Sequence, residues 1–205
     1  MRCVNCGAFS LRTICAACAA NLAECRLGMR QVESFSVFYY YGYSEIRELI
    51  LSKHHEYGAA VLARIASLSL AKFPLHLQRE ISANPQNYEA FKTDGIFKFN
   101  AVPLDDDARS GYSHTAILAR ALKSELIEPK FHCLRAQNRV KYTGQSLEFR
   151  LKHKRNFKIL TPPQFPVILV DDIITSGLSM LQARESLIDG GFMPVCGLVL
   201  ANAKE

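Results

Sequence analysis

The sequence predicts an α/β fold with a parallel, doubly wound sheet, preceded by a small cysteine-rich element. Short apolar runs such as Val167–Val170 alternate along the chain with amphipathic stretches, which is typical of strands that alternate with helices. A length of 205 residues and a hydrophobic content of 49% suit one such domain with a small appendage. Four cysteines within the first 18 residues indicate where the appendage lies.

The first half of the chain is predicted to contain a strand pair, two helices and a surface excursion. Residues 32–43 alternate apolar and polar side chains and then become aromatic-rich, which favours two strands or an edge hairpin. Ser44 can cap a following helix, and Gly58 separates that helix from a second one over 59–72. Residues 74–95 are polar and hold two prolines and an Asp-Gly turn, so we expect a surface excursion there.

The second half is expected to supply most of the sheet. Around the central strand we predict three further strands and two helices: Phe97–Val102, Phe131–Leu134 and Val195–Ala201 as strands, and Ser113–Leu126 and Leu178–Ile188 as helices. Gly190-Gly191 is a fitting stop for the last helix. Ligands of such sheets bind at the carboxyl ends of the strands, so the segment after Val170 is the first candidate site.

The cysteines near the N-terminus have the spacing of metal ligands. Two Cys-x2-Cys pairs, separated by eight residues, are formed by Cys3, Cys6, Cys15 and Cys18. Four thiolates are the number that a tetrahedral structural Zn²⁺ takes, and they leave no open coordination position. Scattered core cysteines and a redox pair are the alternatives, but residues 1–20 leave no room for the βαβ unit of a redox pair. We therefore expect a zinc finger over residues 1–25, followed by a main domain over 32–205.

Carboxylates, hydroxyls and a glycine follow the central strand in order. Asp171 and Asp172 come first, and the further candidate binding residues are Thr175, Ser176, Gly177, Leu178 and Ser179. A strand–loop–helix turn directs backbone N–H groups and the positive end of the helix dipole at one spot, which suits a phosphate. The carboxylates beside it can accept hydrogen bonds from sugar hydroxyls or hold a hydrated Mg²⁺. The alternative is an ordinary turn with two acidic residues before the helix.

Positive charge is concentrated in one segment, 135–160, which we expect to be mobile. It holds eight Lys and Arg and one acid, so it alone carries +7 where the whole chain carries +6. Such a segment beside a phosphate site can contact a pyrophosphate, a nucleotide or a nucleic-acid backbone, or it can be a solvated loop. Aromatic residues interleave with these charges and favour nucleic acid. The candidate contact residues are Arg109, Arg150, Lys152, Lys154 and Arg155.

The segment from Asp171 to Ser179 resembles the 5-phosphoribosyl-1-pyrophosphate (PRPP) signature of type I phosphoribosyltransferases. It has Thr-Ser-Gly-Leu-Ser where the signature has Thr-Thr-Gly-x-Thr, so every hydroxyl is kept. Further matches are the four-cysteine finger, Val102-Pro103-Leu104, the helix entry that starts at Arg109, and the spaced Gln145 and Asn156. Together these motifs resemble the ComF/GntX-type family of phosphoribosyltransferase-fold proteins.

Two segments depart from the pattern of that family. Tyr112-Ser113-His114 replaces the usual Phe-Asn-Gln at the helix entry. Asp105, Asp106 and Asp107 stand at the position of the pyrophosphate loop, where the family generally carries neutral or basic residues. Carboxylates there would repel pyrophosphate unless Mg²⁺ intervenes, and the alternative is a plain solvated acidic turn.

The resemblance implies a type I phosphoribosyltransferase-like parallel sheet with flanking helices, and a role in bacterial competence. Such a protein handles imported single-stranded DNA in the cytoplasm during natural transformation, with DNA-uptake partners such as a helicase. The resemblance also implies binding of PRPP with Mg²⁺, and, for an active enzyme, catalytic roles for Asp171 and Asp172. The alternatives are a metabolic phosphoribosyltransferase that acts on a base or amine, and a non-catalytic PRPP sensor.

Hydropathy bears on the expected location. No apolar run approaches the ~20 residues that span a bilayer, and the first residues lack the apolar region of a signal peptide. The sequence therefore predicts no transmembrane segment. We expect a cytoplasmic protein, including peripheral contact with the inner face of the cytoplasmic membrane.

Overall fold

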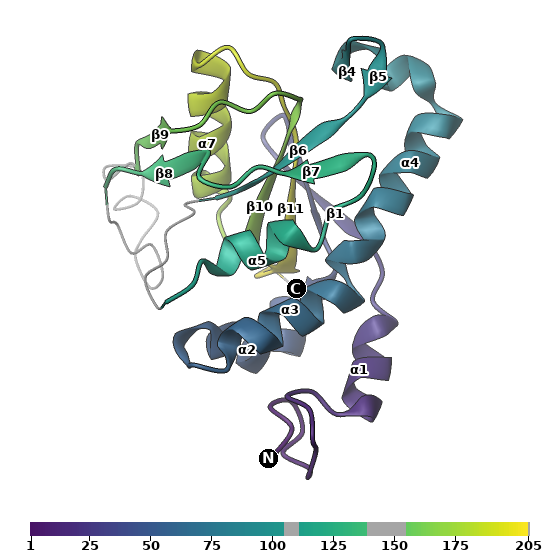
Figure 1. Cartoon of the computed structure of the whole chain (residues 1–205), viewed down its shortest axis with the longest axis vertical. Helices are drawn as coiled ribbons and strands as arrows, with labels where there is room; N and C mark the ends of the chain where they lie inside the picture. Colours follow the sequence, from purple (N-terminus) through teal and green to yellow (C-terminus); the bar gives the residue numbers. More distant parts are fainter. Residues whose placement is uncertain (105–110, 139–154, 205) are drawn as a thin grey trace.

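A central sheet with flanking helices forms the body of the protein in the computed structural model (Figure 1). The structure describes residues 1–104, 111–138 and 155–204. Six strands form the main path of the sheet in the order β1-β2-β11-β10-β6-β7, and β3 also pairs with β11. Their bounds are β1 (Gly28–Val32), β2 (Phe35–Tyr39), β3 (Tyr41–Gly42), β6 (Phe99–Pro103), β7 (Ile127–Pro129), β10 (Val167–Ile174) and β11 (Pro194–Asn202).

The sheet is mixed and mostly parallel. All its pairings are parallel except that of β1 with β2, which form an antiparallel hairpin. The predicted α/β class is confirmed, and the sheet is parallel apart from this edge, where a strand pair or edge hairpin was expected. The hairpin also begins earlier than the predicted 32–43, because Glu33 takes a positive φ of 53° and turns the chain directly after Val32.

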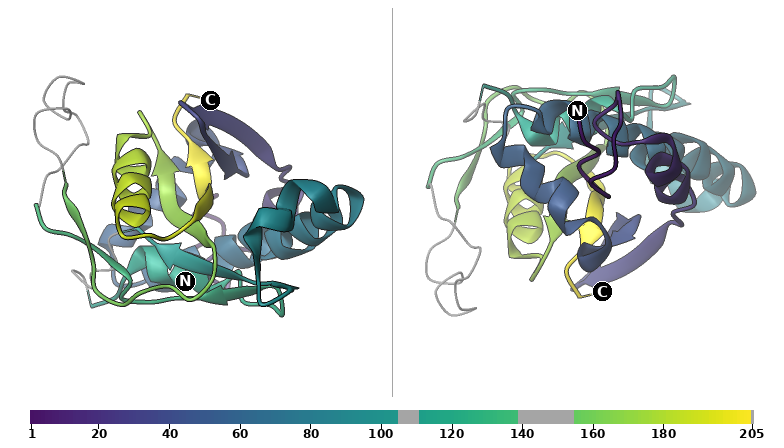
Figure 2. Two further views of the ribbon diagram at one scale, coloured as in Figure 1. Left: turned by 90° about the horizontal axis from the view of Figure 1, so that it is seen from above. Right: turned by 90° about the horizontal axis from the view of Figure 1, so that it is seen from below.

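Alternating side chains of the central strand face two separate cores. Ile168 and Val170 pack with residues of the helices from the first half of the chain, whereas Val167 and Leu169 pack with the last helix. All four side chains are fully buried. Figure 2 shows the helices on the two sides of the sheet. Burial on both faces explains why this strand is an unbroken apolar run in the sequence.

The helices and minor strands complete the described chain. The α-helices are α1 (Ala16–Ala23), α2 (Tyr43–Leu51), α3 (Gly58–Leu68), α4 (Phe73–Ala83), α5 (His114–Arg120) and α7 (Leu178–Asp189). Three short 3-10 helices are η1 (Ser52–His54), η2 (Leu70–Lys72) and η3 (Pro85–Phe91). Two small antiparallel pairs are β4 (Lys92–Thr93) with β5 (Ile96–Phe97), and β8 (Leu134–Ala136) with β9 (Phe157–Ile159).

Two predictions for the first half of the chain are wrong. Gly42, not Ser44, caps α2, and the Glu45 carboxylate accepts a hydrogen bond from the Gly42 amide at 2.8 Å. Residues 73–83 form a helix rather than the start of a surface excursion. Proline stands at the second position of α4. Backbone N–H groups in the first helical turn have no partner within the helix, so the missing N–H of proline costs nothing there.

Two predictions for the second half also need correction. The predicted helix over 113–126 ends at Arg120, because Ser124 forms a turn in which its hydroxyl accepts from the Ile127 amide at 3.0 Å. The predicted strand over 131–134 is absent from the described residues. His132 takes a positive φ of 54°, which interrupts an extended chain, and β7 and β8 lie on either side of it.

The cysteine-rich element packs against the main body. Cys3, Ile14, Cys18 and Leu22 belong to the same buried cluster as the side chains of α3. Figure 1 shows the element at one end of the molecule, with α1 close to the helices that follow it. Residues 1–25 therefore share a hydrophobic core with the rest of the chain.

One described stretch, Gly58–Ala83, is long and apolar enough by composition to cross a membrane. It consists of α3, η2 and α4, and 44% of its most apolar window is buried inside the protein. Val61, Leu62 and Ile65 are fully buried in the core.

Candidate functional site

The four N-terminal cysteines converge on one point. Their Sγ atoms all lie within 4.8 Å of one another, and those of Cys6 and Cys15 are 3.8 Å apart. Zn–S bonds of about 2.3 Å in a tetrahedron place two sulfurs about 3.8 Å apart, so the spacing fits zinc. The amide of Cys15 donates to Cys3 Sγ at 3.3 Å, and the amide of Cys18 donates to Cys15 Sγ at 3.5 Å. The structure thus brings all four predicted ligands together around a possible metal position.

The thiols at this position have opposing pKa shifts. Burial raises the pKa of Cys3, but backbone N–H donors, led by that of Cys15, outweigh it and lower the pKa to about 6. A hydrogen bond with Asn5 lowers the pKa of Cys18, but burial and the neighbouring cysteine sulfurs raise it to about 12. Four adjacent thiolates repel one another, and a divalent cation among them removes that repulsion.

Gly177 is the turning point between β10 and α7. Its φ is +86°, and α7 begins at the next residue, Leu178. A Cβ at Gly177 would stand 2.5 Å from Val32 Cγ1, so a larger residue does not fit without a shift. The Ser176 hydroxyl accepts from the Leu178 amide at 3.5 Å. The predicted residues from Thr175 to Ser179 therefore form one tight turn at the N-terminus of a 12-residue helix, a favourable position for an anion.

The two acids lie inside β10 rather than beyond its end. β6 pairs with β10 only as far as Val170, so Asp171 and Asp172 stand where one side of the strand has no β6 partner. The Asp172 side chain is almost fully buried and forms an ion pair with Lys53 of η1, with 2.5 Å between Oδ2 and Nζ. The Asp172 amide donates to Asp171 Oδ1 at 2.9 Å.

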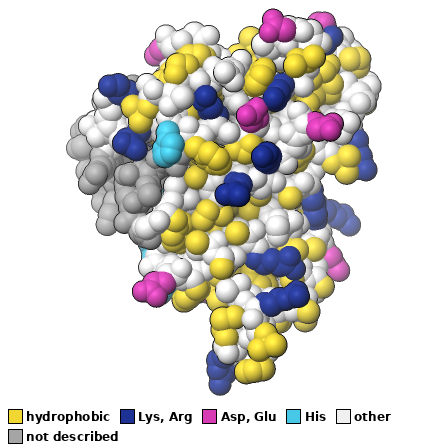
Figure 3. Space-filling view, in the orientation of Figure 1, with side chains coloured by type: hydrophobic (Ala, Val, Ile, Leu, Met, Phe, Trp, Pro, Cys, Tyr) yellow, Lys and Arg dark blue, Asp and Glu magenta, His cyan; other side chains and the backbone are white. Residues whose placement is uncertain are grey.

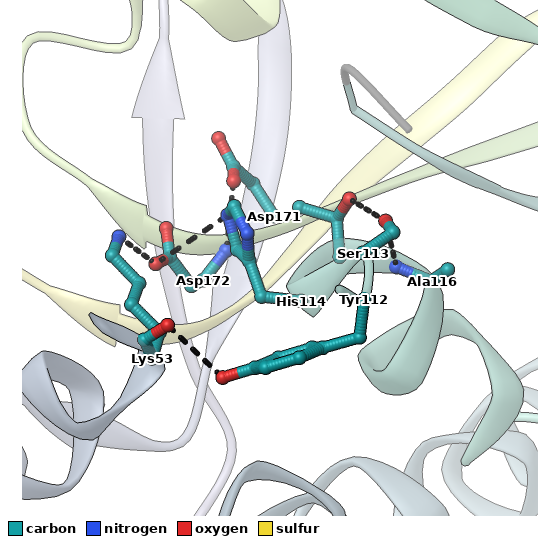
Figure 4. Close-up of polar contacts among 8 residues, drawn as sticks. Lys53, Tyr112, Ser113, His114, Ala116, Asp171 and Asp172 are labelled. Atoms are coloured by element: carbon teal, nitrogen blue, oxygen red, sulfur yellow. Dashed lines mark hydrogen bonds and ion pairs between the residues drawn. The ribbon is translucent and has the colours of Figure 1, made fainter. Parts of the chain in front are cut away.

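Lys53, Tyr112 and His114 complete this arrangement, and the sequence indicated a functional role for none of them (Figure 4). His114, the first residue of α5, places Nε2 3.9 Å from Asp172 Oδ2. Ligand atoms of His114, Asp171 and Asp172 lie within 4.8 Å of one another, a separation that a cation can bridge. The Tyr112 hydroxyl donates to the Lys53 carbonyl at 3.0 Å and holds η1 against the start of α5. The sequence placed His114 only at a helix entry, and the structure places it at the acid pair.

Burial and charge give the two acids different pKa values. Burial raises the pKa of Asp171 to about 8, and the neighbouring charge of Asp172 adds to the effect. Burial also acts to raise the pKa of Asp172, but Lys53 and then His114 outweigh it and lower that pKa. Lys53 and Asp172 are therefore the charged pair, and Asp171 is the acid of the two that takes up a proton more readily.

Arg30 ties the edge hairpin to the turn at Gly177. Its Nη1 donates to the carbonyl oxygen of Thr175 at 2.7 Å and to Asn202 Oδ1 at 3.1 Å. These partners lie 145 and 172 residues away in the sequence, so no local pattern could indicate the contact. The turn is thus fixed from β1 as well as from α7.

The predicted basic contacts are described in part. Arg109, Arg150, Lys152 and Lys154 lie outside the described residues, as do Asp105 to Asp107. Arg155 lies near the first turns of α7, because its amide donates to Gln182 Oε1 of that helix at 3.0 Å. Its charge also acts to lower the pKa of Asp171. One of the five predicted cationic contacts therefore lies near the site.

The fold and these two sites define an α/β protein with a four-cysteine metal position and an acidic site next to a helix N-terminus. No protein-family model matches the chain, and no curated protein is significantly similar to it in sequence. The resemblance to ComF/GntX-type proteins therefore stays a prediction, and the function has to be inferred from the residues of the sites.

Proposed function

We propose that this chain binds PRPP with Mg²⁺ at the carboxyl end of β10 and handles single-stranded DNA in the cytoplasm during natural transformation. The observation that carries the PRPP part is the turn at Gly177. It joins a buried strand with two acids to a helix N-terminus through hydroxyl residues. Backbone N–H groups and a helix dipole there favour a phosphate group.

The proposed ligand is divided between the turn and the acids. Residues Thr175 to Ser179 hold the 5-phosphate, and Asp171 accepts hydrogen bonds from the ribose hydroxyls. The Asp172 charge is already compensated by Lys53, which reduces the repulsion that two adjacent carboxylates exert on an anionic ligand. The carboxylates of Asp171 and Asp172 are the oxygen ligands that Mg²⁺ prefers, so Mg²⁺ can enter together with the pyrophosphate.

The DNA part of the proposal depends on charge. The segment 135–160 supplies +7 of formal charge, counted as eight cations and one acid, and Arg155 is near the first turns of α7. A cationic segment with interleaved aromatic residues suits the backbone and bases of a single strand. The proposed location is the cytoplasm or the inner face of its membrane, beside DNA-uptake partners such as a helicase.

A metabolic phosphoribosyltransferase and a non-catalytic PRPP sensor are the competing functions. The ion pair of Lys53 with Asp172 and the raised pKa of Asp171 reduce the negative charge of the acid site. This favours binding of an anionic ligand but identifies no general base. Deletion of the gene distinguishes the proposed function from that of a metabolic phosphoribosyltransferase. Loss of transformation without purine or pyrimidine auxotrophy is expected only for a DNA-handling protein.

Thermal unfolding with millimolar PRPP and Mg²⁺ tests the phosphate site. Ligand at about 100 times its Kd stabilises the folded state by about 2.7 kcal/mol, which raises the Tm of a domain of this size by about 5–10 °C. Ribose 5-phosphate should shift the Tm less. Asp171→Asn should reduce the PRPP shift, whereas the control Glu185→Gln, an exposed acid on α7, should retain it. No PRPP shift in the unmodified protein would rule out this part of the proposal.

Salt-dependent binding of single-stranded DNA tests the other part. Neutralisation of three to five phosphates gives a log–log slope of roughly −2 to −3.5 for single strands. Changing Lys152, Lys154 and Arg155 together to Glu should flatten the slope. A control with the same change of charge replaces the exposed cations Arg47, Arg79 and Lys123 by Glu. Equal loss in both triple variants would mean that net charge, not this segment, binds the strand.

A further inference from the structure

A cavity of about 420 Å³ lies between the cysteine-rich element and the turn that follows α2. The element contributes Met1, Arg2, Cys3, Val4 and Thr13 to its wall. The opposite wall is formed by Glu48, Leu51, Ser52, His55 and Tyr57. The volume is within the range of small-ligand pockets, and the cavity is separate from the turn at Gly177.

Two aromatic rings at this wall form a flat platform. The rings of His55 and Tyr57 are stacked, with 5.2 Å between centroids and an interplanar angle of 3°. Both residues are exposed, and Tyr57 keeps 46% of its surface accessible. An exposed aromatic ring leaves apolar surface in contact with water. A planar ligand that stacks on the ring covers that surface, so a flat ring at a cavity mouth suits such a ligand.

The polar groups of the cavity are mixed, which narrows the class of ligand. The Arg2 guanidinium has five N–H donors and uses one on the Gly7 carbonyl oxygen at 3.3 Å. Glu48 offers acceptors, and Thr13 offers a hydroxyl that can donate or accept. The Glu48 carboxylate is already paired with Arg47, with 3.0 Å between Oε1 and Nη1, so its charge does not exclude an anion. An anion held by Arg2 would leave the aromatic rings uncovered, and an acyl chain would leave the polar groups without partners. A nucleobase has a planar face and a hydrogen-bonding edge with donors and acceptors, so it matches both parts of the wall.

The cavity is joined to the acid site through one short segment. Residues 52–57 place Ser52, His55 and Tyr57 in the cavity wall and Lys53 on Asp172. The Tyr112 hydroxyl contacts the Lys53 carbonyl, and a Cβ on Gly58 would stand 2.4 Å from the same hydroxyl. The close packing of Tyr112 on this segment fixes the aromatic platform relative to the acid pair.

We propose that this cavity binds a nucleobase, with its ring stacked on Tyr57 and its edge towards Arg2 and Glu48. The base is supplied either by a single strand of DNA or by a free base or nucleoside. The inference rests on the proposed function for one point, that the ligand belongs to nucleic-acid chemistry. It does not require PRPP binding. It assigns a base-binding role to the surface between the cysteine-rich element and α2.

The experiment compares two fluorescent strands of about 15 nucleotides, which is near the upper site size for such binding. One is oligo-dT, and the other has the same sugar–phosphate chain without bases. Tyr57→Leu keeps an apolar side chain but removes the ring, and Tyr57→Phe is the matched control that keeps it. We expect Tyr57→Leu to weaken oligo-dT binding about 5- to 100-fold, from the usual contribution of one base stacked on an aromatic ring. Binding of the abasic strand should be the same for all three proteins.

Free thymidine and deoxyadenosine distinguish the two sources of the base. Binding of a nucleoside that Tyr57→Leu abolishes would support the cavity as a site for free bases, and strand-only binding with the same Tyr57 dependence would support DNA. Equal affinity of the Leu and Phe variants for oligo-dT, with no nucleoside binding, would overturn the inference. The same would follow if no probe bound the unmodified protein. A PRPP-induced Tm shift on each variant is measured in parallel, so a failure of the phosphate site is recognised separately.

Discussion

Replacement of Gly177 by alanine tests whether the turn before α7 has the shape that the structure gives it. The new Cβ would lie 2.5 Å from Val32 Cγ1 and 3.0 Å from Cγ2, and the backbone has φ +86°. An L-residue in the left-handed region costs about 1–2 kcal/mol, and overpacking of a filled site adds about 1–3 kcal/mol. We therefore expect Gly177→Ala to lower the free energy of unfolding by about 2–5 kcal/mol.

Gly191 provides a matched control for the backbone part of this loss. Its φ is +81°, but a Cβ there would meet nothing within 4 Å, so Gly191→Ala should lose only about 1–2 kcal/mol. The effect of alanine on the entropy of the unfolded chain is common to both variants and cancels in the comparison. Urea unfolding followed by circular dichroism measures both free energies.

The steric part can be isolated with a second change at the contact. Val32→Ala removes the two methyl groups that the new Cβ would meet, so the double variant Gly177→Ala with Val32→Ala should be more stable than the sum of the single changes predicts. We expect a coupling energy of about 1–3 kcal/mol. Equal losses for Gly177→Ala and Gly191→Ala, together with strict additivity, would refute the close contact between the hairpin and the turn.

Three further predictions concern the metal position and the acid pair. Metal analysis should return one Zn²⁺ per chain. Cys18→Ser should lower this ratio, whereas the control Cys25→Ala, which removes a sulfur outside the cluster, should keep it. Zinc that survives two ligand substitutions would contradict the assignment. The Asp171 pKa is raised from 3.8 to about 8, so the folded state keeps a proton that the unfolded chain has lost between these values. Stability should therefore fall as pH rises from about 4 to about 8, and Asp171→Asn should remove this part of the slope of urea midpoints against pH; identical slopes would count against it. Lys53→Met should destabilise the fold by about 3–5 kcal/mol because it leaves the buried Asp172 charge unpaired. Adding Asp172→Asn should recover most of this loss in the same urea unfolding assay. An unchanged urea midpoint for Lys53→Met would show that the pair is not formed.

The parts of the fold that depend on local pattern were predictable. Val167–Val170 is apolar because both faces of β10 are covered, and the spacing of Cys3 to Cys18 reflects a shared metal position. Gly177 was recognisable because a tight turn into a helix limits the residue type. In each case the physical constraint acts on residues that are close together in the sequence.

The helix α4 shows where a local pattern was present but misread. Two prolines and many polar residues suggested an excursion, yet Phe73, Leu77 and Ile81 recur every four residues and are buried. This spacing puts them on one face of a helix, and Pro74 stands in the first turn, where proline is tolerated. The period of these apolar residues is therefore the local signal of the helix.

Other parts of the site depend on contacts that no local pattern carries. Lys53 is 119 residues from Asp172, and Arg30 is 145 residues from Thr175. A lysine at a helix end or an arginine in an edge strand is usually solvated, so its role emerges only when the sheet brings the two segments together. His114 offers the same lesson, since its proximity to the acids depends on where α5 begins.

The strand order has a consequence for how the chain folds as it is synthesised. β11, the last strand, lies between β2 and β10, so β2 has no parallel neighbour until residue 202 has been made. At usual rates of translation, the interval between completion of β2 and of β11 is roughly 10–30 s. Throughout it the early hairpin has an unpaired edge, which other chains can join. Removal of the C-terminal strand should therefore leave two separate sheet fragments rather than a shortened fold.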